Sequence, residues 1–160
     1  MPNFDLKYFM REELKTDEIV EVPGLATFKD DKGAPIPFQI KVIGIERINE
    51  LRKAYSKNRI VIDEKGKRLF DKAGKPVLER DVDSVMATNR LIVEALVFPD
   101  LKNQELMEFY GCHDIDQMPF KVFKKNTDYQ YVSEKVTEVL GLSSQEDEPS
   151  DDELVAEAKN

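Results

Sequence analysis

The residue types that could support catalysis come closest together at Cys112, His113 and Asp114, which are consecutive in the chain. A thiol, an imidazole and a carboxylate are the groups of a nucleophile–base–acid triad, which must converge on one point in space. Adjacent side chains on a loop point in different directions, so the run favours a loop after a helix cap. The sequence therefore predicts no catalytic residues and no enzyme.

The sequence also offers few ligands for a metal or cofactor. Asp114 and Asp116 have the alternate spacing seen in calcium loops, but the further oxygen ligands and the glycine of such a loop are missing. Capping of the next helical turn is the favoured role for this pair. One cysteine and one histidine are too few for zinc, and neither a P-loop nor a dinucleotide glycine pattern occurs. We predict no metal and no cofactor.

The negative charge is concentrated at the C-terminus. Of the net charge of -8, residues 143–160 hold seven acids and one base, which leaves residues 1–142 almost neutral. Residues 143–150 have the composition of a disordered linker. Residues 151–158 carry capping residues and place Leu154 and Val155 on one side of a short helix that could form on a partner. The prediction is a globular domain, 1–142, followed by a flexible acidic tail that either contacts a partner or merely solubilises.

Composition excludes several classes of function. An acidic balance disfavours nucleic acid as the main ligand, and no stretch approaches the roughly 20 apolar residues of a membrane helix. The N-terminus does not look like a secretory signal, and a single cysteine fits the reducing cytoplasm. Basic residues around Phe70 could bind single strands, but interleaved acids favour a solvated hairpin. The sequence predicts a cytoplasmic protein that works by binding other proteins.

Hydrophobic periodicity predicts an α+β fold, with a β-hairpin region near the N-terminus and a mainly helical C-terminal half. The hairpin pairs residues 19–28 with 38–43, and the chain from 63 to 78 is left open between a second hairpin and a mobile loop. The predicted helices cover residues 3–15, 47–55, 81 or 83 to 98, 104–110, 120–123 and 127–140.

Several helix ends are predicted from capping chemistry. Pro99 stops the helix that ends at Phe98, and Asn103 caps the next helix. Gly111 takes a left-handed conformation at the end of that helix. Thr127 and Gln130 form a capping box at the start of the last one.

The C-terminal half is rich in aromatic residues. Each ring buries so much apolar area that a core role is favoured for most of them. A partner-binding surface is the alternative role for the rest of these aromatic residues. The cluster comprises Phe98, Phe109, Tyr110, Phe120, Phe123, Tyr129 and Tyr131.

The order of these segments resembles the XkdN-like phage tail assembly chaperones over roughly residues 15–142. The most specific piece is a helix ending in Phe-Pro-Asp-Leu at 98–101, followed by Asn-x-Glu-Leu at 103–106 and Tyr-Gly at 110–111. The residues at 63–78 and the length of the acidic tail depart from the family pattern. Other matching segments are Ile36–Ile43, Asn49–Lys53, Thr127–Tyr129 and Leu140–Leu142.

The resemblance implies a chaperone in the host bacterial cytoplasm that coats the tape measure protein of a contractile tail. It also implies that the chaperone helps recruit tail tube subunits and leaves before the tail is finished. In many such systems a ribosomal frameshift makes a longer form. Self-association stays open. The candidate partner-binding residues are Phe98, Leu101, Phe109, Tyr110, Leu154 and Val155.

Three other functions compete with this interpretation. The first alternative is a permanent structural or adaptor component of a contractile tail, which would remain in the mature particle. An enzyme would need a pocket with convergent polar groups, and the sequence offers no such cluster. An acidic mimic of nucleic acid would spread its charge over the folded surface, whereas here the charge gathers in residues 143–160.

Overall fold

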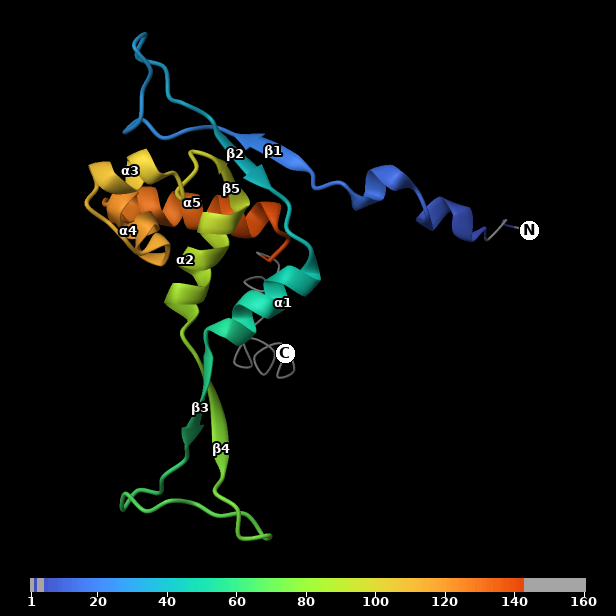
Figure 1. Ribbon diagram of the computed structural model, residues 1–160, viewed down its shortest axis with the longest axis vertical. Coiled ribbons are helices and arrows are strands. Elements are labelled where there is room, and N and C mark those ends of the chain that lie inside the picture. The colour runs from blue at the N-terminus through green and yellow to red at the C-terminus, as the bar shows by residue number, and fades with distance from the viewer. Residues whose placement is uncertain (1, 3–4, 143–160) are drawn as a thin grey trace, which may run out of the picture.

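A computed structural model describes residue 2 and residues 5–142 of the chain. Helices form a central body, and two hairpins leave it at opposite ends of the long axis (Figure 1). The hairpin at one end is made by β1 (Ile19–Val22) and β2 (Phe38–Lys41), and the arm at the other end by β3 (Ser56–Ile60) and β4 (Leu78–Val82). The predicted α+β fold is confirmed.

The first hairpin belongs to a three-stranded antiparallel sheet of order β1-β2-β5, in which β5 is Leu96–Phe98. Val22 pairs with Phe38 at one end of the hairpin and Ile19 with Lys41 at the other. The side chains of β2 alternate, so that Phe38 and Ile40 are buried while Gln39 is exposed. This alternation fixes which face of the sheet meets the helices.

Helix α2 (Ser84–Ala95) is the central element; it begins as predicted, after Asp83, but it ends earlier than predicted. Asp83 caps its start, where a side-chain oxygen accepts from the Met86 amide at 3.1 Å. The predicted helix to Phe98 is wrong, because the chain leaves the helix after Ala95 and forms β5. There Leu96 pairs with Ile40 of β2, and this strand pairing replaces the last helical turn.

Four helices pack against α2: α1 (Ile45–Ala54), α4 (Met118–Val122), α5 (Asn126–Val139) and a 3-10 helix at Ile115–Gln117. Helix α3 (Gln104–Phe109) packs against the core through the partly buried side chains of Leu106 and Met107. The core side chains that are almost inaccessible to solvent include Ile40, Ile92, Leu101, Phe123 and Val132.

Local capping chemistry was predicted correctly at α3 and incorrectly at α5. Asn103 accepts a hydrogen bond from the Leu106 amide at 3.1 Å, and Gly111 follows with a φ of 61°. The capping box of Thr127 and Gln130 is wrong. Helix α5 starts at Asn126 with no side-chain cap, so Thr127 already lies within its first turn.

The N-terminal segment also differs from the prediction. Two 3-10 helices, Leu6–Phe9 and Glu12–Lys15, replace the expected amphipathic helix, and neither contains a buried residue. Most of the stability of an amphipathic helix comes from packing its apolar face. Without such packing, the apolar residues of this segment do not produce a regular α-helix here.

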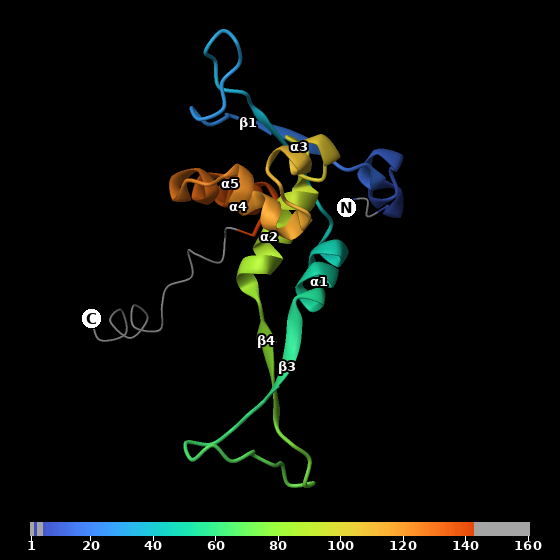
Figure 2. The same ribbon diagram turned by 60° about the vertical axis from the view of Figure 1, so that its left-hand side comes forward.

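The arm resolves the segment left open between a hairpin and a loop. Five residues of β3 pair in register with β4, from Ser56 opposite Val82 to Ile60 opposite Leu78. These strands flank the open segment, and the chain between them forms two successive turns with isolated bridges at Ile62–Arg68 and Phe70–Pro76. The arm continues beyond these strands and ends far from the helical body in both views (Figures 1 and 2).

We predict that Asn89→Leu destabilises the fold by about 3 kcal/mol, because each buried polar group left unpaired costs about 1–3 kcal/mol. Asn89 is fully buried in α2 and donates to the Asp116 carbonyl oxygen at 2.9 Å. Its side-chain oxygen accepts from the Tyr129 hydroxyl at 2.6 Å. Urea unfolding measures the loss. The matched variant Asn58→Leu, exposed on β3, should change stability by less than about 0.5 kcal/mol; equal effects would contradict the prediction.

Candidate protein-binding surface

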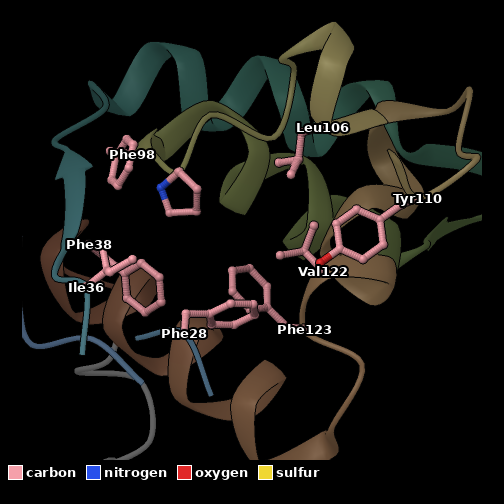
Figure 3. A pocket seen from close by; sticks show the side chains of 9 residues that line it. Phe28, Ile36, Phe38, Phe98, Leu106, Tyr110, Val122 and Phe123 are labelled. Atoms are coloured by element: carbon pink, nitrogen blue, oxygen red, sulfur yellow. The ribbon is translucent and has the colours of Figure 1, made fainter. Parts of the chain in front are cut away.

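An apolar cavity of about 170 Å³ opens where the first hairpin meets the helical body. Figure 3 shows side chains from the β1–β2 connection, β2, β5, α3 and α4 around one open centre. Nearly all of the lining atoms are carbon, so the cavity favours apolar side chains over polar ligands. The lining residues are Phe28, Ile36, Phe38, Phe98, Pro99, Leu106, Tyr110, Val122 and Phe123.

Phe123 forms the rigid wall of this cavity. It is 1% exposed, and its ring lies edge-on to those of Phe28 and Phe38, with both pairs of centroids 5.9 Å apart. Edge-to-face rings stabilise each other beyond the area that they bury. Two elements far apart in the sequence, the β1–β2 connection and α4, are thereby held together at the cavity.

The β1–β2 connection is also held by two polar contacts with α5. The Thr27 hydroxyl donates to a carboxylate oxygen of Asp128 at 2.7 Å, and the Tyr131 hydroxyl donates to the Pro23 carbonyl oxygen at 2.7 Å. Both contacts are close enough to be good hydrogen bonds. They fix the wall of the cavity that Phe28 and Ile36 provide.

A wider groove adjoins the cavity along α3. It is lined by Asp100, Asn103, Glu105 and Phe109, and it shares Phe98, Pro99 and Leu106 with the cavity. Phe98 is 50% exposed and Phe109 is 80% exposed. Two large aromatic side chains therefore face solvent beside an apolar hollow. We call this cavity and groove together the aromatic groove.

Four of the predicted partner-binding residues fall in or beside the aromatic groove. Phe98, Phe109 and Tyr110 line it. Leu101 is fully buried in the core, so its position suits support of the groove rather than direct contact. Leu154 and Val155 lie outside the described residues. Partner binding by these side chains stays a prediction.

The sequence analysis missed the half of the cavity that comes from the first hairpin. Phe28, Ile36 and Phe38 were not candidate site residues, although the hairpin itself was predicted. Alternation alone shows that Phe38 faces inward, but not that α4 will meet it there. Only the contact with Phe123, across more than 80 residues of chain, brings the two halves together.

Ionisable groups with shifted pKa values cluster elsewhere, around α2. Burial and a hydrogen bond to Asp116 raise the pKa of Tyr55 to about 12. Hydrogen bonds from Arg47, including one of 2.9 Å from its Nε, lower the pKa of Glu94. None of these residues lines the aromatic groove, so the shifts reflect contacts that join α1, α2 and the 3-10 helix.

Cys112, His113 and Asp114 lie on the loop that follows α3. The Cys112 side chain is buried, and its sulfur donates to the Asp114 carbonyl oxygen at 3.2 Å, while His113 is exposed. Asp114 accepts from the Asp116 amide at 3.0 Å and so caps the 3-10 helix, as predicted. Over residues 2 and 5–142, no group of three or more His, Cys, Asp or Glu side chains could hold a metal ion.

Residues 6–159 match the family described as phage XkdN-like tail assembly chaperone protein.

The chain belongs to the XkdN-like tail assembly chaperone family.

Relatives of this XkdN-like chain occur in Bacillus subtilis (strain 168). The phage-like element PBSX protein XkdN is 32% identical over 157 residues, which cover 98% of this chain and 95% of that protein. The uncharacterized protein YqbN is 31% identical over 139 residues, or 87% of this chain and 85% of that protein. Both the recognised family and its link to a prophage element are thus confirmed.

The fold of this XkdN-like chain is similar to the crystal structure of the protein YqbN, with a TM-score of 0.66 and 28% sequence identity. The match covers 88% of this chain and 98% of that one. No helix in the described part of the chain is long and apolar enough to cross a membrane.

We expect Gly24→Ala to deform the aromatic groove and to cost about 1–3 kcal/mol of stability, the range for overpacking. An added Cβ would lie 1.9 Å from the Ile36 carbonyl oxygen, so the backbone that supports the Ile36 wall must move. Chemical denaturation measures the cost. In Gly44→Ala nothing lies within 4 Å of the new Cβ, and we expect less than about 1 kcal/mol, from helix capping alone. A larger loss of stability in Gly44→Ala than in Gly24→Ala would contradict the predicted contact with the Ile36 carbonyl oxygen.

Proposed function

We propose that this chain binds the tape measure protein during assembly of a contractile phage or prophage tail and helps recruit tail tube subunits. The observation that carries the proposal is the aromatic groove, in which Phe98 and Phe109 are exposed beside an apolar cavity. Amphipathic helices bind proteins by placing an apolar face in such grooves. A tape measure protein has long apolar helices that would aggregate if they were left uncovered.

The groove suits reversible binding. Its cavity is small, at about 170 Å³, so one copy covers only a short stretch of a partner helix. Many copies along one tape measure protein would give avidity from weak individual contacts, and each could still be displaced. We therefore propose that the chaperone acts in the host bacterial cytoplasm and leaves as the tube polymerises. Neither nucleic acid nor a membrane is a partner in this proposal, and self-association stays open.

Co-expression with the tape measure protein of the same phage or prophage element tests the proposal. The tape measure protein should be insoluble alone and soluble with this chain. Quantitative mass spectrometry of purified mature tails should find no copies of this chain. A stoichiometric amount in mature tails would instead support the alternative, a permanent structural or adaptor component. Solubility of the tape measure protein without this chain would remove the need for a chaperone.

A further inference from the structure

The arm is built from a repeated eight-residue unit with the pattern apolar-x-Asp-x-x-Gly-x-x. Two units follow one another in the arm, at 61–68 and 69–76, and a third lies in the β1–β2 connection, at 28–35. In all three, the aspartate (Asp30, Asp63 or Asp71) accepts from the amides two and four residues later at 2.9 Å. The glycine of each has a φ between 76° and 81°. The same sequence pattern therefore makes the same turn three times.

The two units of the arm close into a ring of backbone hydrogen bonds. The amide of Leu69 donates to the Val61 carbonyl oxygen at 3.0 Å, that of Val77 to Leu69 at 2.9 Å, and that of Val61 to Val77 at 3.0 Å. We call residues 61–77 the arm tip. The ring gives the arm tip a defined backbone, although it stands apart from the core (Figures 1 and 2).

The arm tip presents positive charge around an exposed aromatic ring. It carries five basic residues and three acidic ones, but Asp63 and Asp71 already accept two backbone hydrogen bonds each. Phe70 is 59% exposed. In the part of the chain that the structure describes, no basic residue of the arm tip takes part in a salt bridge. These residues are Lys65, Lys67, Arg68, Lys72 and Lys75.

The complementary charge lies in the same chain. Residues 143–160 hold seven acids and one base, together with Leu154 and Val155 as apolar side chains. The described chain ends at Leu142, which packs against the core, and the following 18 residues could extend over about 60 Å. A covalent link raises the effective concentration of a segment into the millimolar range, so weak ionic contacts suffice for binding within one molecule.

We propose that the acidic segment 143–160 docks on the arm tip of its own chain. Its carboxylates lie against the five basic residues, and its apolar side chains cover Phe70. Docking shields the basic, aromatic surface and places the acidic segment away from the aromatic groove. The inference does not depend on the identity of the partner that the groove binds.

Amide NMR spectra of the full-length ¹⁵N-labelled protein test the docking. At 50 mM NaCl the amides of 143–160 should differ from those of a synthetic peptide of that sequence. At 1 M NaCl they should move to the peptide positions, because the Debye length falls to about 3 Å. In Lys67→Gln/Lys72→Gln the ratio of docked to free segment should fall roughly three- to tenfold at low salt. Lys29→Gln/Lys32→Gln, in the unit at 28–35, removes equal charge and should leave the ratio unchanged.

A second variant leaves the arm untouched. Asp151→Asn/Asp152→Asn should shift the amides of Gly66 and Gly74, the two tip glycines, toward their positions in 1 M NaCl. This result would support docking even if the lysine variant disturbed the arm.

Four outcomes would overturn the proposal. The first is that the amides of 143–160 match the peptide already at 50 mM NaCl, and the second is that the arm and control lysine variants behave alike. A third is that the shifts fade on dilution from 500 to 10 µM, which would assign the segment to a second copy. The fourth is that a 15-mer of thymidylate shifts Gly66 and Gly74 while the segment remains free, which would make the tip a nucleic-acid site.

Discussion

Replacing Phe109 by serine should weaken capture of the tape measure protein about 30-fold while the fold remains intact. Phe109 is 80% exposed at the edge of the aromatic groove, so the folded protein loses little packing. Exposed aromatic anchors of an interface commonly contribute about 2 kcal/mol or more to binding. Phe98→Ser should have a similar effect on binding. Affinity is measured by fluorescence anisotropy with a labelled helical segment of the tape measure protein, and folding by circular dichroism.

Phe9→Ser is the matched control, because Phe9 is also 80% exposed and lies in the N-terminal 3-10 helix, away from the groove. Its affinity should equal that of the unmodified protein. If Phe109→Ser bound as tightly as the control, the aromatic groove would not be the binding surface. If both variants lost affinity together, the partner would be recognising exposed apolar residues without regard to their place in the fold.

Phe123→Ala should destabilise the protein by about 4 kcal/mol, within the range for removing a buried phenylalanine. Phe123 is 1% exposed and meets Phe28 and Phe38 edge-on, so its loss opens the core and removes one wall of the groove. Urea-induced unfolding followed by tyrosine fluorescence measures the change. Phe120→Ala, in α4 just before Phe123 but partly exposed, should cost less than about 1.5 kcal/mol. If Phe123→Ala also cost less than about 1.5 kcal/mol, the neighbouring side chains would have to collapse into the cavity that the missing ring leaves.

The parts of the fold that could be predicted from sequence are those decided by local chemistry. Asn103 and Gly111 bracket α3 because a side-chain oxygen and a left-handed glycine act within one turn. Strand β2 was predicted because its alternation has a period of two. In each case the deciding groups lie within a few residues of one another.

The capping box at Thr127 and Gln130 was an error of local chemistry, but the end of α2 and the cavity were missed because distant contacts decide them. The residues before Leu96 have helical periodicity, which predicted a helix through Phe98, yet Leu96 pairs with Ile40 of β2. The cavity was missed for the same reason, since its walls come from the first hairpin and from α4. The repeat in the arm was visible in the sequence, because Asp63 and Gly66 recur eight residues later as Asp71 and Gly74.

The contacts of the β1–β2 connection with α5 have a consequence for synthesis of the protein on the ribosome. Thr27 and Asp128 are separated by 101 positions, and Pro23 and Tyr131 by 108. The arm tip, by contrast, closes through hydrogen bonds between residues eight or sixteen positions apart. Short loops close at lower entropic cost than long ones. The arm can therefore form early in translation, whereas the aromatic groove is completed only after most of the chain has emerged, so a nascent chain has its arm before its aromatic groove is complete.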